Sequence, residues 1–154
     1  KAAIDVNKDQ KVMLFKKACR RLITFKGLKV AVLGLTFKPG TDDLREAPSL
    51  DNIPLLLDKG ADIYAYDPVG MDNFKKKYPE GENGNGRITY VHSPEKALED
   101  ANVCFIFTEW NQIKAVKPEV YKKLMRTPLV YDGRNIYGVE EMKKAGVEYY
   151  SIGR

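Results

Sequence analysis

The regular alternation of apolar runs with helical patterns is the feature that most constrains the fold of this chain. The apolar runs are of strand length and lie at 29–35, 62–66, 88–91, 103–107, 129–131 and 148–152. The helical patterns fill the gaps between them, at 49–59, 71–78, 94–101, 118–125 and 139–145. Strands that alternate with helices of this length form βαβ units, and right-handed crossovers then place helices on both faces of the sheet. The sequence therefore predicts the α/β class, as a Rossmann-like, doubly wound domain with a mostly parallel, six-stranded sheet.

A further helical pattern precedes the first of these runs. Apolar side chains recur at three- and four-residue steps from Val12 to Ile23, with lysines and arginines between them. Gly27 gives a stop signal for this helix. We therefore expect a helix over 1–26 and one domain over 27–154, long enough to bury a full core. The first residue is Lys1 rather than Met, which indicates a piece of a longer chain.

Composition and charge exclude several classes of protein. No apolar run approaches the roughly 18 residues of a membrane span, and the polar N-terminus lacks the apolar region of a signal peptide. The formal net charge is +5, but the basic residues form only short clusters, which are typical of solvated helix faces. Because basic and aromatic residues are not interleaved, we expect no nucleic-acid partner. A modest attraction for anionic small molecules stays open.

The two cysteines form neither a metal-ligand cluster nor a disulfide framework. Cys104 lies in the apolar run "VCFIF" and Cys19 lies in the first helical pattern, so we interpret both as core residues. We therefore expect no metal site and a reducing, cytoplasmic setting. The only histidine, His92, is interpreted as a surface or capping residue.

The stretch "PEGENGNGR", residues 79–87, has the composition of a phosphate-binding loop. It follows a helix and precedes a strand, however, which is the wrong end of a βα unit for that role. We interpret it as a turn or a flexible insertion.

The loop after the first apolar run is the best-placed loop for a ligand, because ligands of open α/β sheets bind at the carboxyl ends of the strands. It reads "GLTFKPGTDDLREAPS" and lacks the G-x-G-x-x-G fingerprint of a dinucleotide site. Asp67 stands where a ribose-binding acid would stand, although an Asp-Pro turn explains it equally well. Lys38 and Arg45 suit an anionic ligand. Equally, they could pair with Asp42 and Asp43 in a surface loop without a ligand.

These residues carry a resemblance that favours the first alternative. "GLTFKPGTDDLREAPS" resembles the motif that opens the C-terminal domain of the UDP-glucose/GDP-mannose dehydrogenase family. "TEW" at 108–110, "DGRNIY" at 132–137 and "YYSIGR" at 149–154 follow in the family's order. "IDVNKDQ" resembles the end of the helix that links the two domains of that family. Ala47 departs from the family, which commonly has Ser at this position, but a small residue still fits.

The resemblance implies an activity and its partners. Members of the family oxidise the C6 hydroxyl of a nucleotide sugar with two NAD in succession, and the motifs favour UDP-glucose as the substrate. NAD would be held mainly by an N-terminal domain of the same protein, residues 1–26 would end the inter-domain helix, and residues 27–154 would cover the UDP-sugar. A homodimer is implied as well. A GDP-mannose or UDP-N-acetylhexosamine dehydrogenase, or a stand-alone binding module, remains an alternative.

The resemblance also assigns roles to four residues. Phe37, through its backbone, and Lys38, through its ammonium group, match contacts with the UDP-sugar, and Arg134 matches an arginine that reaches the same ligand. Arg45 matches an arginine that reaches NAD on the other domain. No catalytic residue is expected in this chain, because nothing here matches the family's Gly-rich motif with its nucleophilic cysteine. We interpret Asp132 as a turn former and Trp110 as a packing residue.

Overall fold

The computed structural model describes residues 10–153, and its sheet is organised around a central strand whose last four residues are buried. The strands are β1 (Lys29–Leu33), β2 (Asp62–Tyr66), β3 (Gly81–Asn83), β4 (Gly86–Tyr90), β5 (Val103–Ile106), β6 (Leu129–Asp132) and β7 (Glu148–Ser151). Their order is β3-β4-β2-β1-β5-β6-β7. Only β3 is antiparallel to its neighbour, and β1 pairs in parallel with both β2 and β5. The chain therefore builds one half of the sheet, returns past β1, and builds the other half.

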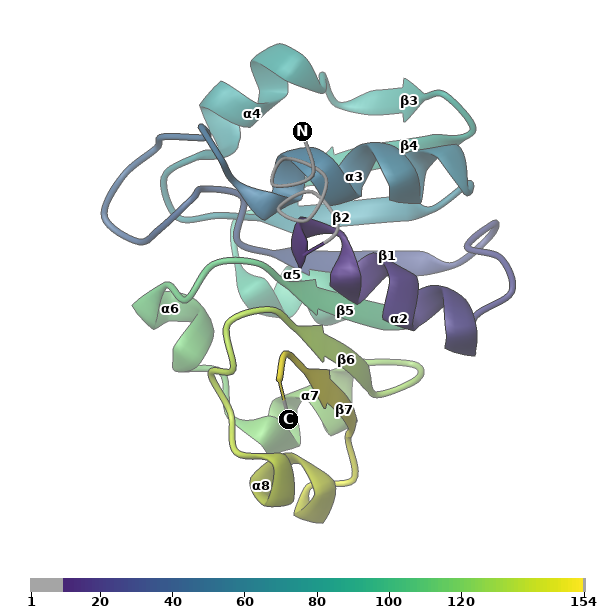
Figure 1. Ribbon diagram of the computed structural model, residues 1–154, viewed down its shortest axis with the longest axis vertical. Coiled ribbons are helices and arrows are strands. Elements are labelled where there is room, and N and C mark those ends of the chain that lie inside the picture. The colour runs from purple at the N-terminus through teal and green to yellow at the C-terminus, as the bar shows by residue number, and fades with distance from the viewer. Residues whose placement is uncertain (1–9, 154) are drawn as a thin grey trace.

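Helices cover both faces of this sheet (Figure 1). They are α2 (Met13–Arg21), α3 (Pro48–Asp58), α4 (Met71–Lys77), α5 (Pro94–Leu98), α6 (Asn111–Lys114), α7 (Pro118–Leu124) and α8 (Val139–Lys144). In Figure 1, α2 and α3 lie in front of the sheet, whereas α5 and α7 lie behind it. Successive strand residues point to opposite faces. Val30 and Val32 accordingly belong to the core beneath α2 and α3, and Ala31 and Leu33 to the core beneath α5 and α7.

The local sequence explains where several helices begin and end. Pro48 and Pro94 stand at first-turn positions, where the missing N–H costs no helical hydrogen bond. Ser93 caps α5, because its side chain accepts a hydrogen bond from the Lys96 amide. Gly60 follows α3 with a φ of 88°, the left-handed conformation that commonly ends a helix.

The doubly wound, mostly parallel α/β fold is confirmed, but the strand count of six is wrong. The extra strand is β3, which lies in the segment interpreted as a turn or a flexible insertion. Gly81 pairs with Ile88 and Asn83 with Gly86, so this segment forms an antiparallel hairpin at the sheet edge. A three-residue edge strand without an apolar side chain gives no periodic signal in the sequence, and that is why it was missed.

The N-terminal helix differs from the expectation as well. In the part that the structure describes, α2 ends at Arg21, because Leu22 adopts an extended conformation. Phe25 then turns back into the core, where it is fully buried and stacks on Phe15 with ring centroids 6.1 Å apart. Burial of this ring ends the helix before Lys26. Residues 1–9 of the expected helix lie outside the described residues.

The two cysteines have different environments. Cys104 is fully buried in β5, as expected, whereas Cys19 is exposed on α2 and its interpretation as a core residue is wrong. His92 is exposed, as expected. Within residues 10–153, no helix is long and apolar enough to cross a membrane.

Candidate functional site

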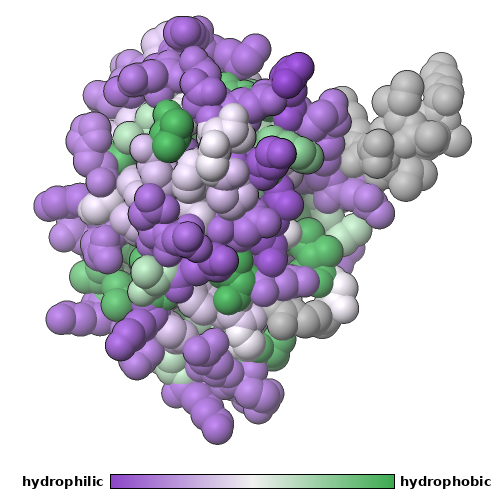
Figure 2. Space-filling view, turned by 90° about the vertical axis from the view of Figure 1, so that its left-hand side faces the viewer, coloured by the Kyte–Doolittle hydropathy of each residue, from purple (hydrophilic) through white to green (hydrophobic). Residues whose placement is uncertain are grey.

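The candidate site lies at the carboxyl edge of the sheet, where the order of the strands reverses between β1 and β5. Connections from neighbouring strands diverge at such a point and leave room for a ligand between them. The loops that follow β1, β5 and β6 meet here. Figure 2 looks onto this edge, whose surface is mostly hydrophilic with separate hydrophobic spots.

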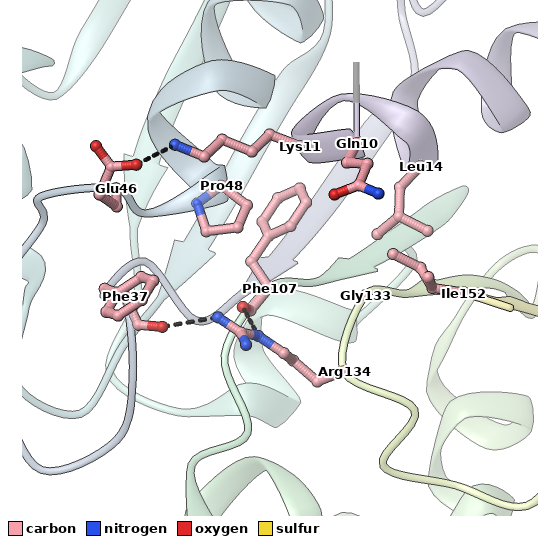
Figure 3. Close-up of a pocket in the computed structure, with 10 residues that line it drawn as sticks. All are labelled: Gln10, Lys11, Leu14, Phe37, Glu46, Pro48, Phe107, Gly133, Arg134 and Ile152. Carbon is pink, nitrogen blue, oxygen red and sulfur yellow. Dashed lines mark hydrogen bonds and ion pairs between the residues drawn. The ribbon is translucent and has the colours of Figure 1, made fainter. Parts of the chain in front are cut away.

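A cavity of about 240 Å³ opens between these loops and the start of α2. Its walls are formed by Gln10, Lys11, Leu14, Phe37, Glu46, Pro48, Phe107, Gly133, Arg134 and Ile152 (Figure 3). Apolar side chains supply much of the wall, and a few polar groups stand at its rim, which is the usual character of a small-molecule site. Lys11 Nζ and Glu46 Oε1 form an ion pair of 2.8 Å across one side of the opening.

Arg134 is held in a fixed position by backbone carbonyls of two different loops. Its Nε donates to the carbonyl oxygen of Phe107 at 2.9 Å, and its Nη2 donates to that of Phe37 at 2.7 Å. Glu109 lies nearby, with Oε1 3.6 Å from Nε. A guanidinium group has five N–H donors in a rigid fork. The two carbonyls engage only part of that fork and leave donors for a ligand.

The turn that carries Arg134 is built on Asp132, which is completely buried. Its Oδ1 accepts the Arg134 amide at 2.8 Å, and its Oδ2 accepts the Ile136 amide and the Tyr149 hydroxyl. Asn135 adopts a φ of 54° between them. The interpretation of Asp132 as a turn former is therefore confirmed, and this turn directs Arg134 toward the cavity.

Phe37 and Arg134, two of the residues singled out in the sequence, meet at this cavity. The Phe37 side chain is 41% exposed, its amide donates to the Asp43 carbonyl at 3.0 Å, and its own carbonyl accepts from Arg134. Lys38 is exposed and does not line the cavity. Among the residues that the structure describes, Lys38 forms no ion pair, so its ammonium group is available to a ligand. The binding roles of all three residues stay predictions.

Arg45 lies beside a different, more open hollow of about 580 Å³, together with Lys76 and Lys77 of α4. Asp43 holds it through a pair of 2.8 Å between Arg45 Nη2 and Asp43 Oδ2. The hydrogen bonds from Arg45 lower the pKa of Asp43 to about 2. The alternative of a salt-bridged surface loop therefore describes Asp43 and Arg45, but it does not describe Lys38. Even so, the Arg45 side chain is 88% exposed and can still reach outward.

A buried polar cluster lies directly beneath this site and was not predicted from the sequence. It is formed by Thr36, Asp67, Thr108 and Trp110. All four are buried, and Trp110 Nε1 donates to Asp67 Oδ2 and Thr36 Oγ1 at 3.1 Å each. Trp110 is thus more than a packing residue. A signal for the cluster existed in the sequence, since polar residues follow the ends of three strands that turn out to be adjacent. Within residues 10–153, no group of three or more His, Cys, Asp or Glu side chains could hold a metal ion.

The fold and the site together define a class: α/β domains that hold an anionic small molecule at the switch point of a parallel sheet. The model of the UDP-glucose/GDP-mannose dehydrogenase family, UDP binding domain, matches residues 31–139. The chain belongs to this family, as the motifs in the sequence indicated, and corresponds to its C-terminal domain.

Curated relatives and solved structures agree with this assignment. The UDP-glucose 6-dehydrogenase YwqF of Bacillus subtilis is 42% identical over 154 residues, covering 100% of this chain and 34% of that protein. The UDP-glucose 6-dehydrogenase of Rhizobium meliloti is 43% identical over 129 residues, covering 84% of this chain and 28% of that protein. A UDP-glucose dehydrogenase structure from Pyrobaculum islandicum superposes with a TM-score of 0.75 at 29% identity, over 99% of this chain and 31% of that one. The chain therefore spans about a third of the length of the relatives it matches.

Proposed function

We propose that this chain is the nucleotide-sugar-binding domain of an NAD-dependent UDP-glucose 6-dehydrogenase, which converts UDP-glucose to UDP-glucuronate with reduction of two NAD. The observation that carries the proposal is Arg134, fixed by two carbonyls at the rim of a partly apolar cavity. The similarity over the whole chain to YwqF supports UDP-glucose as the substrate.

In this proposal Arg134 and Lys38 bind the diphosphate, and the backbone of Phe37 contacts the same ligand. Arginine forms charge-assisted, often bidentate hydrogen bonds with phosphate oxygens, whereas lysine acts as a flexible point charge. Because Arg134 is already oriented, little side-chain entropy is lost when the ligand binds. The cavity of about 240 Å³ is smaller than a typical pocket for a whole nucleotide sugar. The remaining walls would come from the rest of the protein.

We assign Arg45 to the NAD that the N-terminal domain of the same protein would hold. NAD would supply the hydride acceptor. Within this chain, the amides of Leu35 and Thr36, at the position of a dinucleotide-binding loop, already donate to Asp67. The fit therefore favours a contact from the exposed Arg45 rather than a complete NAD site. Catalytic residues would lie outside this chain, and a homodimer in the cytoplasm completes the proposal.

Two alternatives within the family concern the nucleotide sugar. A UDP-N-acetylmannosamine dehydrogenase structure from Pyrococcus horikoshii superposes with a TM-score of 0.69 at 27% identity. This similarity makes a UDP-N-acetylhexosamine one alternative substrate. GDP-mannose is the other alternative.

The test is NADH formation by the full-length protein with UDP-glucose, a UDP-N-acetylhexosamine and GDP-mannose in parallel. We expect UDP-glucose to give the highest kcat/KM, and Arg134→Ala to lower it by on the order of ten- to hundredfold, the value of a charge-assisted hydrogen bond. Arg126→Ala is the matched control, because Arg126 pairs with Asp100 at the opposite edge of the sheet. An equal loss in both variants, or a preference for another nucleotide sugar, would contradict the proposal. The 154-residue chain alone should form no NADH.

A further inference from the structure

We propose that Asp67 is a positioning residue for the substrate-binding loop, acting as an internal anion in the place that related architectures give to a phosphate group. The proposal rests on the proposed function, since the loop that Asp67 holds is the one that carries Phe37 and Lys38. Nothing in the sequence distinguished this role from that of an ordinary Asp-Pro turn.

The Asp67 carboxylate is completely buried, and every interaction found for it comes from an N–H or O–H donor of the chain. Oδ2 accepts the amides of Leu35 and Thr36 at 2.7 and 3.1 Å. Oδ1 accepts the amides of Val69 and Gly70 at 2.9 and 2.7 Å. A buried carboxylate is costly unless such donors surround it. Four backbone amides that converge on one anion form the kind of concavity that binds phosphate in other proteins.

Two of these amides stand at the position where a dinucleotide-binding domain binds the pyrophosphate of its ligand. Leu35 and Thr36 directly follow β1 and the residue Gly34, where a dinucleotide-binding domain turns its amides toward a pyrophosphate. Here the end of β2 supplies the anion instead. The packing is too close for an external ligand. A Cβ atom placed on Gly70 would lie 2.4 Å from Thr36 Cγ2, and one placed on Gly34 would lie 2.6 Å from Thr108 Cβ.

A network of side chains joins Asp67 to the loops that follow β1 and β5. Trp110 Nε1, from the loop after β5, donates to both Asp67 Oδ2 and Thr36 Oγ1. Thr108 Oγ1 donates to the Thr36 carbonyl at 2.6 Å. Thr36 is therefore held at its amide, its carbonyl and its hydroxyl. Loss of the carboxylate would remove the acceptor that Trp110 Nε1 shares with the Leu35 and Thr36 amides.

Thr36 links this hydrogen-bond network directly to the residues that are proposed to contact the substrate. Phe37 and Lys38 follow Thr36 directly, and Thr36 Oγ1 lies 3.1 Å from the Lys38 carbonyl oxygen. The Phe37 carbonyl then accepts from Arg134. A shift of the peptide at Thr36 would move all three proposed substrate contacts together. Asp67 itself is buried beneath them and touches no ligand, so its effect on binding passes through Thr36.

The experiment replaces the carboxylate and then supplies it again from solution. Asp67→Ala in the full-length protein should raise the KM for UDP-glucose by on the order of tenfold or more, with a smaller change in kcat. Formate should lower this KM toward the original value, whereas chloride at equal ionic strength should not. In the 154-residue chain, Trp110 is the only tryptophan. Its fluorescence should shift in Asp67→Ala and return with formate.

Asn102→Ala is the matched control, because Asn102 Oδ1 accepts the Lys29 amide at 2.9 Å near the opposite edge of the sheet. It should lower Tm without changing the KM for UDP-glucose. If Asp67→Ala does not fold, Trp110→Phe tests the same network, since it removes the donor to Asp67 and keeps a large ring. That variant should raise the KM severalfold.

Different results bear on different claims. An unchanged KM in Asp67→Ala or in the folded Trp110→Phe, or a formate effect on Tm alone, would overturn the positioning role. An equal rise of KM in Asn102→Ala would also overturn it, because loss of stability would then suffice. Failure of the original protein to use any nucleotide sugar would contradict the proposed function instead. The fluorescence response to formate would still decide whether Asp67 is the internal anion of the loop.

Discussion

At the residue scale, the loop after β1 carries two cations whose surroundings differ. Lys38 stands next to Phe37 near the cavity that Arg134 borders, whereas Arg45 is paired with Asp43 beside the hollow at α4. In the proposed function, this loop would serve two ligands: Lys38 in its first part would contact the nucleotide sugar, and Arg45 in its last part would contact the NAD held by another domain.

This arrangement predicts separate kinetic effects in the full-length enzyme. Lys38→Ala should raise the KM for UDP-glucose, and Arg45→Ala should mainly raise the KM for NAD, each by on the order of ten- to hundredfold. Steady-state kinetics with each substrate varied in turn provides the measurement. Both variants should stay folded in a thermal melt, because exposed cations add little to stability. If both variants shifted the same KM, the division of the loop would be wrong.

At the element scale, α2 packs closely against the sheet and against α3. Its apolar side packs on the sheet and on α3, where Leu14, Phe15 and Ala18 are buried. Leu14 also forms a wall of the cavity. The placement of α2 on the sheet therefore helps to shape the candidate site.

Loss of this packing should lower stability measurably. Phe15→Ala should reduce the free energy of unfolding by about 3 kcal/mol, because it removes a buried ring and its stacking on Phe25. Denaturant unfolding of the 154-residue chain would measure the loss. Met13→Ala on the same helix is the control and should have little effect, since Met13 is 37% exposed. Equal losses in the two variants would show that α2 is not docked in this way.

At the scale of the whole molecule, buried tyrosines make the stability of the folded state depend on pH in the alkaline range. Burial raises the pKa of four tyrosine hydroxyls in the core, those of Tyr90, Tyr121, Tyr131 and Tyr137. Tyr121 and Tyr137 also share a hydrogen bond of 2.8 Å between their hydroxyl oxygens. These groups stay protonated in the folded state at a pH where an unfolded chain would lose the protons.

The sign of the effect follows from the raised pKa. The contribution to stability is fully present below the unfolded value of about 10 and is lost as pH rises above it, by about 1.4 kcal/mol per pH unit for each such tyrosine. We expect tyrosinate absorbance from these residues to develop together with unfolding, measured by ultraviolet titration beside circular dichroism. Tyr121→Phe should reduce the pH dependence. Full ionisation of every tyrosine in a folded protein would contradict the prediction.

The order of strands and helices followed from the sequence, because the period of an apolar pattern depends only on neighbours along the chain. The same holds for the loop after β1 as the place of a site, since a parallel sheet always brings the carboxyl ends of its strands to one edge. The motif resemblance identified the family and singled out Phe37, Lys38, Arg45 and Arg134.

The tertiary structure alone decided which of these groups meet. Arg134 is fixed by carbonyls of Phe37 and Phe107, and Asp67 by amides of residues more than thirty positions away in the chain, Leu35 and Thr36. Backbone carbonyls and amides are the same in every residue, so no letter of the sequence marks them as partners. The sequence did not predict the edge strand β3 or the exposure of Cys19, for a related reason. Pairing and burial depend on what packs against a residue, and that is settled only when distant segments come together.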